Sequence, residues 1–134
     1  MSRSLDYGIR VTTDLDYQAA VDAVTAALKD QGFGVLTEID VKATLKKKLN
    51  VGFRRYVILG ACNPQLAHRA LNADIDLGLL LPCNVIVYEG DEGTVVAAID
   101  PKIMVNVADK SAELASVATE AEARLRAALE AISS

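Results

Sequence analysis

Two cysteines are the residues of this sequence whose type and setting are best suited to chemistry. Cys62 lies in the tetrapeptide Ala-Cys-Asn-Pro and Cys83 in Pro-Cys-Asn-Val, so each cysteine precedes an asparagine, Asn63 or Asn84. Two thiols can cycle between dithiol and disulfide, and thiolates bind soft metal ions. The spacing supports this chemistry only in part, because there is no Cys-x-x-Cys pattern and a zinc site needs more sulfur or histidine ligands.

The predicted strands bring the two thiols toward one edge of a sheet. Cys62 follows an apolar strand at residues 56–61, and Cys83 begins the next strand at 83–89. If the two strands pair antiparallel, the end of the first adjoins the start of the second, and we expect the thiols near disulfide distance. Cys62 also precedes a helix that begins at Pro64, where the helix dipole favours a thiolate. Asp100, which ends a strand at 94–99, should reach the same edge.

The candidate thiol, metal or ligand site therefore comprises Cys62, Cys83, Asn63, Asn84, Asp100 and His68. A simpler interpretation is favoured for most of this set. A free cysteine is usually a small buried apolar side chain, and the asparagines suit caps of a helix or turn. His68, which is the only histidine, lies in the helix after Pro64 and is expected to be a surface or hydrogen-bonded residue rather than a base.

A second polar cluster surrounds the end of a strand at residues 33–39. Its members are Glu38, Asp40, Lys42 and Lys46, and the two lysines share one face of the helix predicted at 41–49. Such a cluster can bind a polar ligand or hold a lysine for acid–base work. The favoured interpretation is a helix cap and a solvated ion-pair face. Strand direction places this cluster at the sheet end opposite the cysteines.

Composition restricts the function classes. The formal net charge is −4, which gives no support for nucleic-acid binding. Neither Gly60 nor Gly78 lies in a phosphate-binding motif, and no Gly-x-Ser-x-Gly occurs. No signal peptide or membrane-spanning run is evident, so we expect a cytoplasmic protein without a membrane partner. Residues 1–134 suit a single domain. The sequence identifies no cofactor.

The order of elements predicts an α+β fold. A strand at 7–13 precedes a helix capped by Asp14 or Asp16 and stopped by Gly32. Four strands follow, with short helical insertions, and a long helix begins near Asp109. This order argues for an antiparallel sheet with helices on one face. Three strands look apolar on both faces, so a short helix, a second subunit or an apolar ligand must cover the other face. We favour a homodimer.

Several segments together resemble domain-of-unknown-function family 302. They are Gly-Phe-Gly-Val-Leu-Thr-Glu-Ile-Asp at 32–40, Ala-Cys-Asn-Pro at 61–64, and Leu-Pro-Cys-Asn-Val at 81–85. The resemblance implies a strand–helix–four-strand–helix fold of the TATA-binding-protein-like type, seen as dimers. It implies no activity, and a fold name carries no DNA-binding role.

Three functional hypotheses follow. The first is a non-enzymatic dimeric domain that binds a small molecule or a partner through its sheet and the adjoining strand ends. The second is a thiol-based redox or metal-binding protein that uses Cys62 and Cys83. The third, an enzyme that uses Glu38 and Lys42, has the least support.

Overall fold

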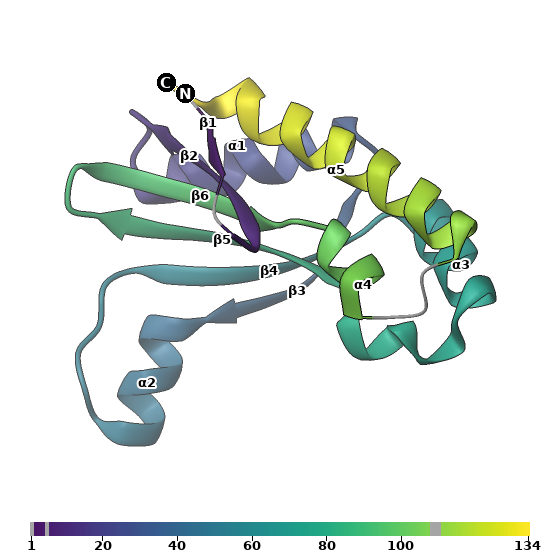
Figure 1. Ribbon diagram of the computed structural model, residues 1–134. Coiled ribbons are helices and arrows are strands. Elements are labelled where there is room, and N and C mark those ends of the chain that lie inside the picture. The colour runs from purple at the N-terminus through teal and green to yellow at the C-terminus, as the bar shows by residue number, and fades with distance from the viewer. Residues whose placement is uncertain (1, 5, 108–110) are drawn as a thin grey trace.

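The computed structural model describes residues 2–4, 6–107 and 111–134, and it has the α+β architecture predicted from the sequence (Figure 1). The elements in chain order are β1 (Ser2–Ser4), β2 (Gly8–Thr13), α1 (Tyr17–Asp30), β3 (Gly34–Asp40), α2 (Val41–Leu49), β4 (Tyr56–Cys62), α3 (Pro64–Ala73), the 3-10 helix η1 (Ile75–Leu80), β5 (Cys83–Gly90), β6 (Gly93–Ile99), α4 (Lys102–Val107) and α5 (Ala112–Ile132). Among the described helices, none is long and apolar enough to span a bilayer.

All strands belong to one antiparallel sheet with the order β1-β2-β6-β5-β4-β3. The central pairs are the β5–β6 hairpin, which turns between Gly90 and Gly93, and β4 beside β5. Because paired residues in antiparallel strands point to the same face, this register decides which side chains meet the helices and which do not.

One face of the sheet packs against α1 and α5, which lie side by side over it (Figure 1). The core is aliphatic, as a sequence without tryptophan and with few aromatic residues requires. Its members come from alternate strand positions and from one stripe of each helix, and include Ile9, Val11, Val57, Leu59, Val85, Val87, Val96, Val24, Leu28, Leu125 and Leu129. In each of α1 and α5 the buried residues recur at helical spacing and face this core.

A second apolar cluster lies at the end of the sheet where β4 finishes and β5 starts. Its buried residues come from α3, η1, β5, α4 and α5, and are Leu66, Ala70, Leu77, Cys83, Met104, Leu114, Val117 and Ala121. Helix α3 begins as predicted, because Asn63 Oδ1 accepts a hydrogen bond from the Leu66 backbone N–H at 3.2 Å and Pro64 follows at the first helical position.

Three elements differ from the sequence-based expectation. The sequence predicts a turn after Asp74, but the structure has the 3-10 helix η1 there. Asp74 caps η1, because its Oδ1 accepts a hydrogen bond from the Asp76 backbone N–H. Helix α4 and strand β1 were not predicted, because both are too short to show a period in the sequence. The expected helix start near Asp109 lies outside the described residues, and α5 is capped by the Ser111 hydroxyl.

The second face of the sheet is not covered by helices α1 and α5. This open face carries Thr12, Val95, Tyr88 and Tyr56 in one row across the strands, and Arg10, Ala97, Ile86, Ile58 and Ile39 in the next. Most of its apolar side chains are half-buried, whereas Ile39 is 48% exposed. The expectation that something must cover this face is therefore not met by the helices within the chain.

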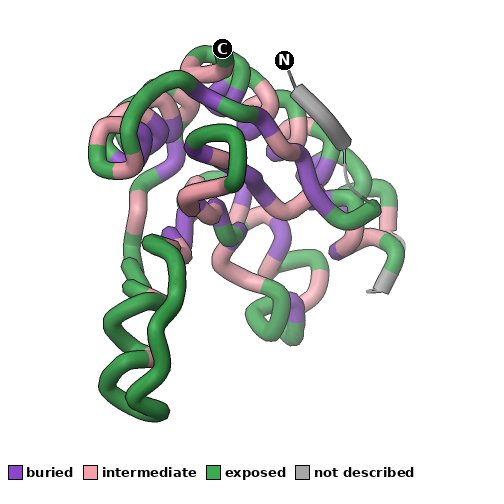
Figure 2. Tube along the Cα trace, turned by 90° about the vertical axis from the view of Figure 1, so that its left-hand side faces the viewer, coloured by how far each residue is buried: buried purple, intermediate pink, exposed green. Residues whose placement is uncertain are grey.

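Residues 41–55, which we name the arm, project away from the body of the molecule (Figures 1 and 2). The arm consists of α2 and the loop to β4, and α2 has no buried residue. Leu49, Val51 and Phe53 are 65%, 44% and 43% exposed. The apolar side of α2, formed by Val41, Leu45 and Leu49, is thus half-buried or exposed and does not enter a core of the same chain.

Candidate functional site

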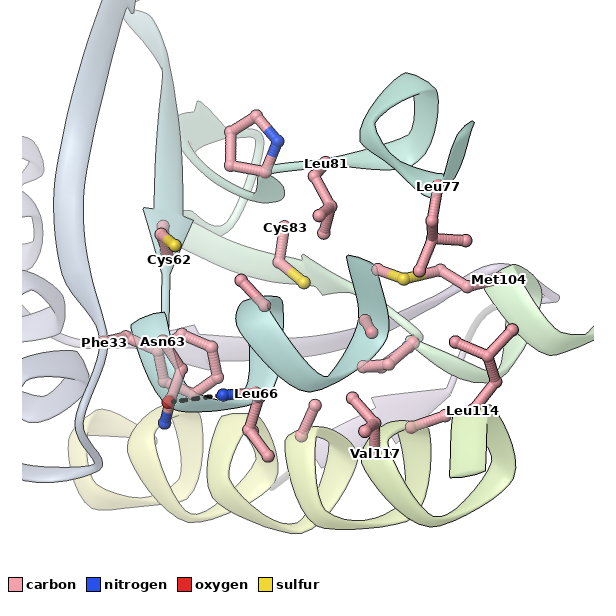
Figure 3. A pocket seen from close by; sticks show the side chains of 17 residues that line it. Phe33, Cys62, Asn63, Leu66, Leu77, Leu81, Cys83, Met104, Leu114 and Val117 are labelled. Atoms are coloured by element: carbon pink, nitrogen blue, oxygen red, sulfur yellow. Dashed lines mark hydrogen bonds between the residues drawn. The ribbon is translucent and has the colours of Figure 1, made fainter. Parts of the chain in front are cut away.

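Both cysteines border one apolar pocket at the end of the sheet (Figure 3). Its walls are Phe33 and the ends of β4 and β5, helices α3 and α5, and the segment from η1 to Pro82. The cavity volume is only about 40 Å³, enough for a few waters. The pocket is therefore a packing gap within the second apolar cluster, far below the size of an ordinary ligand site.

The two thiols are not close, so the prediction that they lie near disulfide distance is wrong. Both cysteines are free. The register pairs Cys83 with Ala61 rather than with Cys62, and successive side chains of a strand point to opposite faces. The sulfur atoms accordingly lie apart in Figure 3.

Burial, and secondarily the charge of Cys62, raises the pKa of the Cys83 thiol to about 11. A thiol of this kind is neutral near pH 7 and is a poor nucleophile. The geometry and the protonation state together weigh against a redox pair.

We expect iodoacetamide at pH 8 to modify Cys62 in the folded protein and to leave Cys83 unmodified, as measured by peptide mass spectrometry. Both cysteines should react in denaturant. In the folded state Cys83 ionises near pH 11 rather than its ordinary 9.0, so its contribution to stability is complete below pH 9 and is lost as the pH rises toward 11. Modification of Cys83 in the folded protein at the rate of Cys62 would contradict this assignment.

The remaining members of the predicted cysteine site are dispersed. Asn84 is exposed on the open face, on the side of the sheet opposite Cys83. Asp100 reaches the expected end of the sheet, but its carboxylate accepts a hydrogen bond from the Lys102 backbone N–H at 3.0 Å and does not border the pocket. His68 is exposed on α3, with its Nε2 3.3 Å from Asn72 Nδ2.

No metal centre is assembled from these groups. Within residues 2–4, 6–107 and 111–134, no three His, Cys, Asp or Glu side chains cluster in a way that could hold a metal ion. Of the two predicted roles for the asparagines, the cap of α3 by Asn63 is observed.

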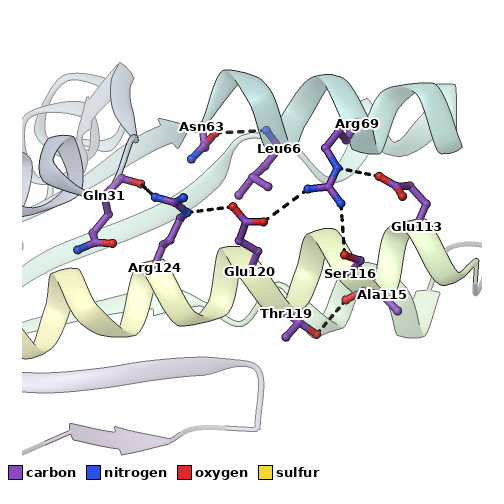
Figure 4. Close-up of polar contacts among 10 residues, drawn as sticks. All are labelled: Gln31, Asn63, Leu66, Arg69, Glu113, Ala115, Ser116, Thr119, Glu120 and Arg124. Carbon is purple, nitrogen blue, oxygen red and sulfur yellow. Dashed lines mark hydrogen bonds and ion pairs between the residues drawn. The ribbon is translucent and has the colours of Figure 1, made fainter.

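Helix α3, which forms one wall of the pocket, is held on α5 by a chain of ion pairs (Figure 4). Arg69 Nε donates to Glu113 Oε1 at 2.7 Å, and Arg69 Nη1 lies 3.5 Å from Glu120 Oε1. Glu120 also pairs with Arg124, which donates to the Gln31 carbonyl at the end of α1. These charges have structural partners and are not available for a ligand.

The second predicted cluster lies at the sheet end opposite the cysteines, as strand direction indicated. Asp40 caps α2 by accepting a hydrogen bond from the Ala43 N–H at 2.9 Å. Burial raises the pKa of Tyr17, and the carboxylates of Asp40 and Glu38 raise it further. Lys42 and Lys46 are exposed on the arm. This arrangement fits the cap and solvated face that the sequence favoured.

The open face provides a larger site; the sequence predicted that this face needs a cover but did not name the residues of the site. A depression of about 490 Å³ lies over β2, β4, β5 and β6, a volume typical of small-molecule sites. The rings of Tyr56 and Tyr88 stack at 5.3 Å with an interplanar angle of 7°, and Arg10 borders the same depression. The signal in the sequence was the alternation within each strand, which places these residues on the face away from the core.

The geometry defines a small α+β domain with helices on one face of its sheet and a hollow, aromatic-lined second face. The chain belongs to the family described as domain of unknown function DUF302, whose model matches residues 9–132. It is similar to the protein in the "crystal structure of uncharacterized conserved protein DUF302 from Bacillus stearothermophilus". The two are 30% identical, with a TM-score of 0.87 over 96% of this chain and 99% of that chain. No curated protein matches the sequence. The likeness to the TATA-binding protein stays a prediction.

Proposed function

We propose that this protein is a non-enzymatic homodimeric domain that binds a small molecule through its open sheet face, and that the arm docks on a second copy. The observation that carries the proposal is the arm itself: α2 has no buried side chain, and Leu49, Val51 and Phe53 are 65%, 44% and 43% exposed. Large exposed apolar patches on a soluble domain mark interaction sites.

Charge supports a second copy as the occupant. The arm contains Lys42, Lys46, Lys47, Lys48, Arg54 and Arg55 and no acidic residue. The rest of the chain holds eight basic and 18 acidic residues, a formal charge of −10. A basic arm is therefore attracted to the body of another copy, and complementary potentials fix orientation and exclude like-charged partners.

The open face supplies an apolar surface for such a contact. Ile39 and Ile58 lie side by side in one row of the sheet, next to the base of the arm. In a two-fold dimer the same patch is used on both copies, so each arm would lie along the other body. This arrangement buries apolar groups on both partners.

The test is native mass spectrometry of a Leu49→Asp, Phe53→Asp variant. We expect the unsubstituted protein to give a dimer mass and the variant a monomer mass, because each aspartate places a charge in the proposed interface. The matched control is Ile75→Asp with Leu79→Asp, which changes two side chains that are 78% and 89% exposed on η1.

Circular dichroism establishes that both variants are folded. A monomeric unsubstituted protein, or a dimer that persists in the arm variant, would overturn the proposal.

A further inference from the structure

We infer that the open face binds a planar aromatic anion, with the negative charge against Arg10 and the ring over Ala97 and Ile86 beside Tyr88. The inference names the ligand class for the small-molecule site of the proposed function, and it rests on that function. An unpaired cation, an aromatic stack and the volume between them favour this class of ligand.

Among the side chains that the structure describes, the Arg10 guanidinium has no hydrogen-bond or ion-pair partner. Arg10 is half-buried in the middle of β2, and its neighbours across the sheet are Ala97 on β6 and Arg3 on β1. Among the arginines whose side chains the structure describes, the other five each have a partner: Arg54 the Glu89 carbonyl, Arg55 Glu89, Arg69 Glu113, Arg124 Glu120 and Arg126 Glu122. A partly desolvated guanidinium favours an anion, which it can bind through two parallel hydrogen bonds.

The floor and wall beside Arg10 suit a flat ring. Ala97 and Ile86 follow Arg10 along one row of the sheet, which gives a flat apolar floor. In the adjoining row, Tyr88 stacks on Tyr56, and Phe53 lies 6.1 Å from Tyr56. Aromatic rings in such a series accept a further ring in an offset or edge-on arrangement.

A second cation strengthens the preference for an anion. The Arg54 guanidinium carbon lies 6.0 Å from the centre of the Tyr88 ring. Arg10, Arg54 and Tyr88 also border a second hollow toward the β5–β6 turn, which Asp91 and Glu92 of the turn line as well. No carboxylate side chain in the described chain pairs with Arg10. The basic arm of a second copy does not satisfy Arg10 either, because like charges repel.

The test compares two dyes that differ by one charge. The anionic probe is 8-anilinonaphthalene-1-sulfonate, and N-phenyl-1-naphthylamine is the same ring system without the sulfonate. Fluorescence titration of the folded protein should give at least about tenfold tighter binding of the sulfonate dye, since one charge-assisted contact is worth roughly a factor of ten.

Variants locate the site. We expect Arg10→Gln to lower the affinity for the sulfonate dye about tenfold and to leave the affinity for the neutral dye unchanged. Tyr88→Leu should lower the affinity for both dyes. Lys29→Gln removes one exposed positive charge from α1, on the other side of the sheet, and should change neither.

The monomeric arm variant separates this inference from the proposed dimer. If that variant still binds the sulfonate dye in an Arg10-dependent way, the ligand assignment holds whether or not the protein is a dimer. Equal affinity for the two dyes, or no effect of Arg10→Gln on sulfonate binding, would overturn the assignment while leaving the dimer intact.

Discussion

Replacement of residues 42–55 by the dipeptide Asn-Gly is expected to give a folded monomer. Strands β3 and β4 pair as far as Asp40 with Val57, so Val41 and Tyr56 would form the next pair and a two-residue hairpin turn would join them. Helix α2 contributes no buried side chain. The core over the other face should therefore be unaffected by the excision.

The measurements are native mass spectrometry and urea unfolding followed by circular dichroism. We expect the loss of the dimer, and a free energy of unfolding within about 1 kcal/mol of that of the monomeric Leu49→Asp, Phe53→Asp variant. That variant is the proper reference because association itself stabilises a folded chain, by an amount that grows with the logarithm of the protein concentration.

Two outcomes of the excision would contradict the prediction. A dimer that survives it would show that the arm is not the interface. A chain that no longer folds would show that the arm supports its own domain, against its exposure in the structure. The excision also removes the exposed ion pair between Arg55 and Glu89, which we expect to matter little because exposed pairs are screened by water.

The second large effect is expected in the core. Leu125 is fully buried between α5 and the sheet, and Leu125→Ala should lower the free energy of unfolding by about 2–5 kcal/mol, because it removes apolar contacts and leaves a cavity. Leu79→Ala is the control, since Leu79 is 89% exposed, and it should cost less than about 0.5 kcal/mol.

Both core variants are to be measured by urea unfolding at one protein concentration. A loss below about 1 kcal/mol for Leu125→Ala would mean that the stripe of α5 does not pack on the sheet as described. Both substitutions remove the same atoms, one set at a buried site and the other at an exposed site. The difference between their effects on the free energy of unfolding therefore measures the contribution of burial.

Local patterns were sufficient to predict most elements. The helical spacing in α1 and α5, the Asp16 and Asn63 caps, and the alternation in β2 depend on residues a few positions apart. The α+β class followed from their order. The short elements β1 and α4 escaped prediction because three and six residues are too few to establish a period.

Sequence by itself thus determined which side chains are apolar and where the chain turns, because those properties are local. The tertiary structure alone decided which of them meet. Pairing Cys83 with Ala61 rather than Cys62 separates the two thiols, since a shift of one residue moves a side chain to the other face. The same register gathers Arg10, Tyr56 and Tyr88, which are far apart in the sequence, onto the open face. Likewise, the amphipathic pattern of α2 indicates a helix that packs on another surface. Only the structure shows that no residue of α2 is buried against its own chain.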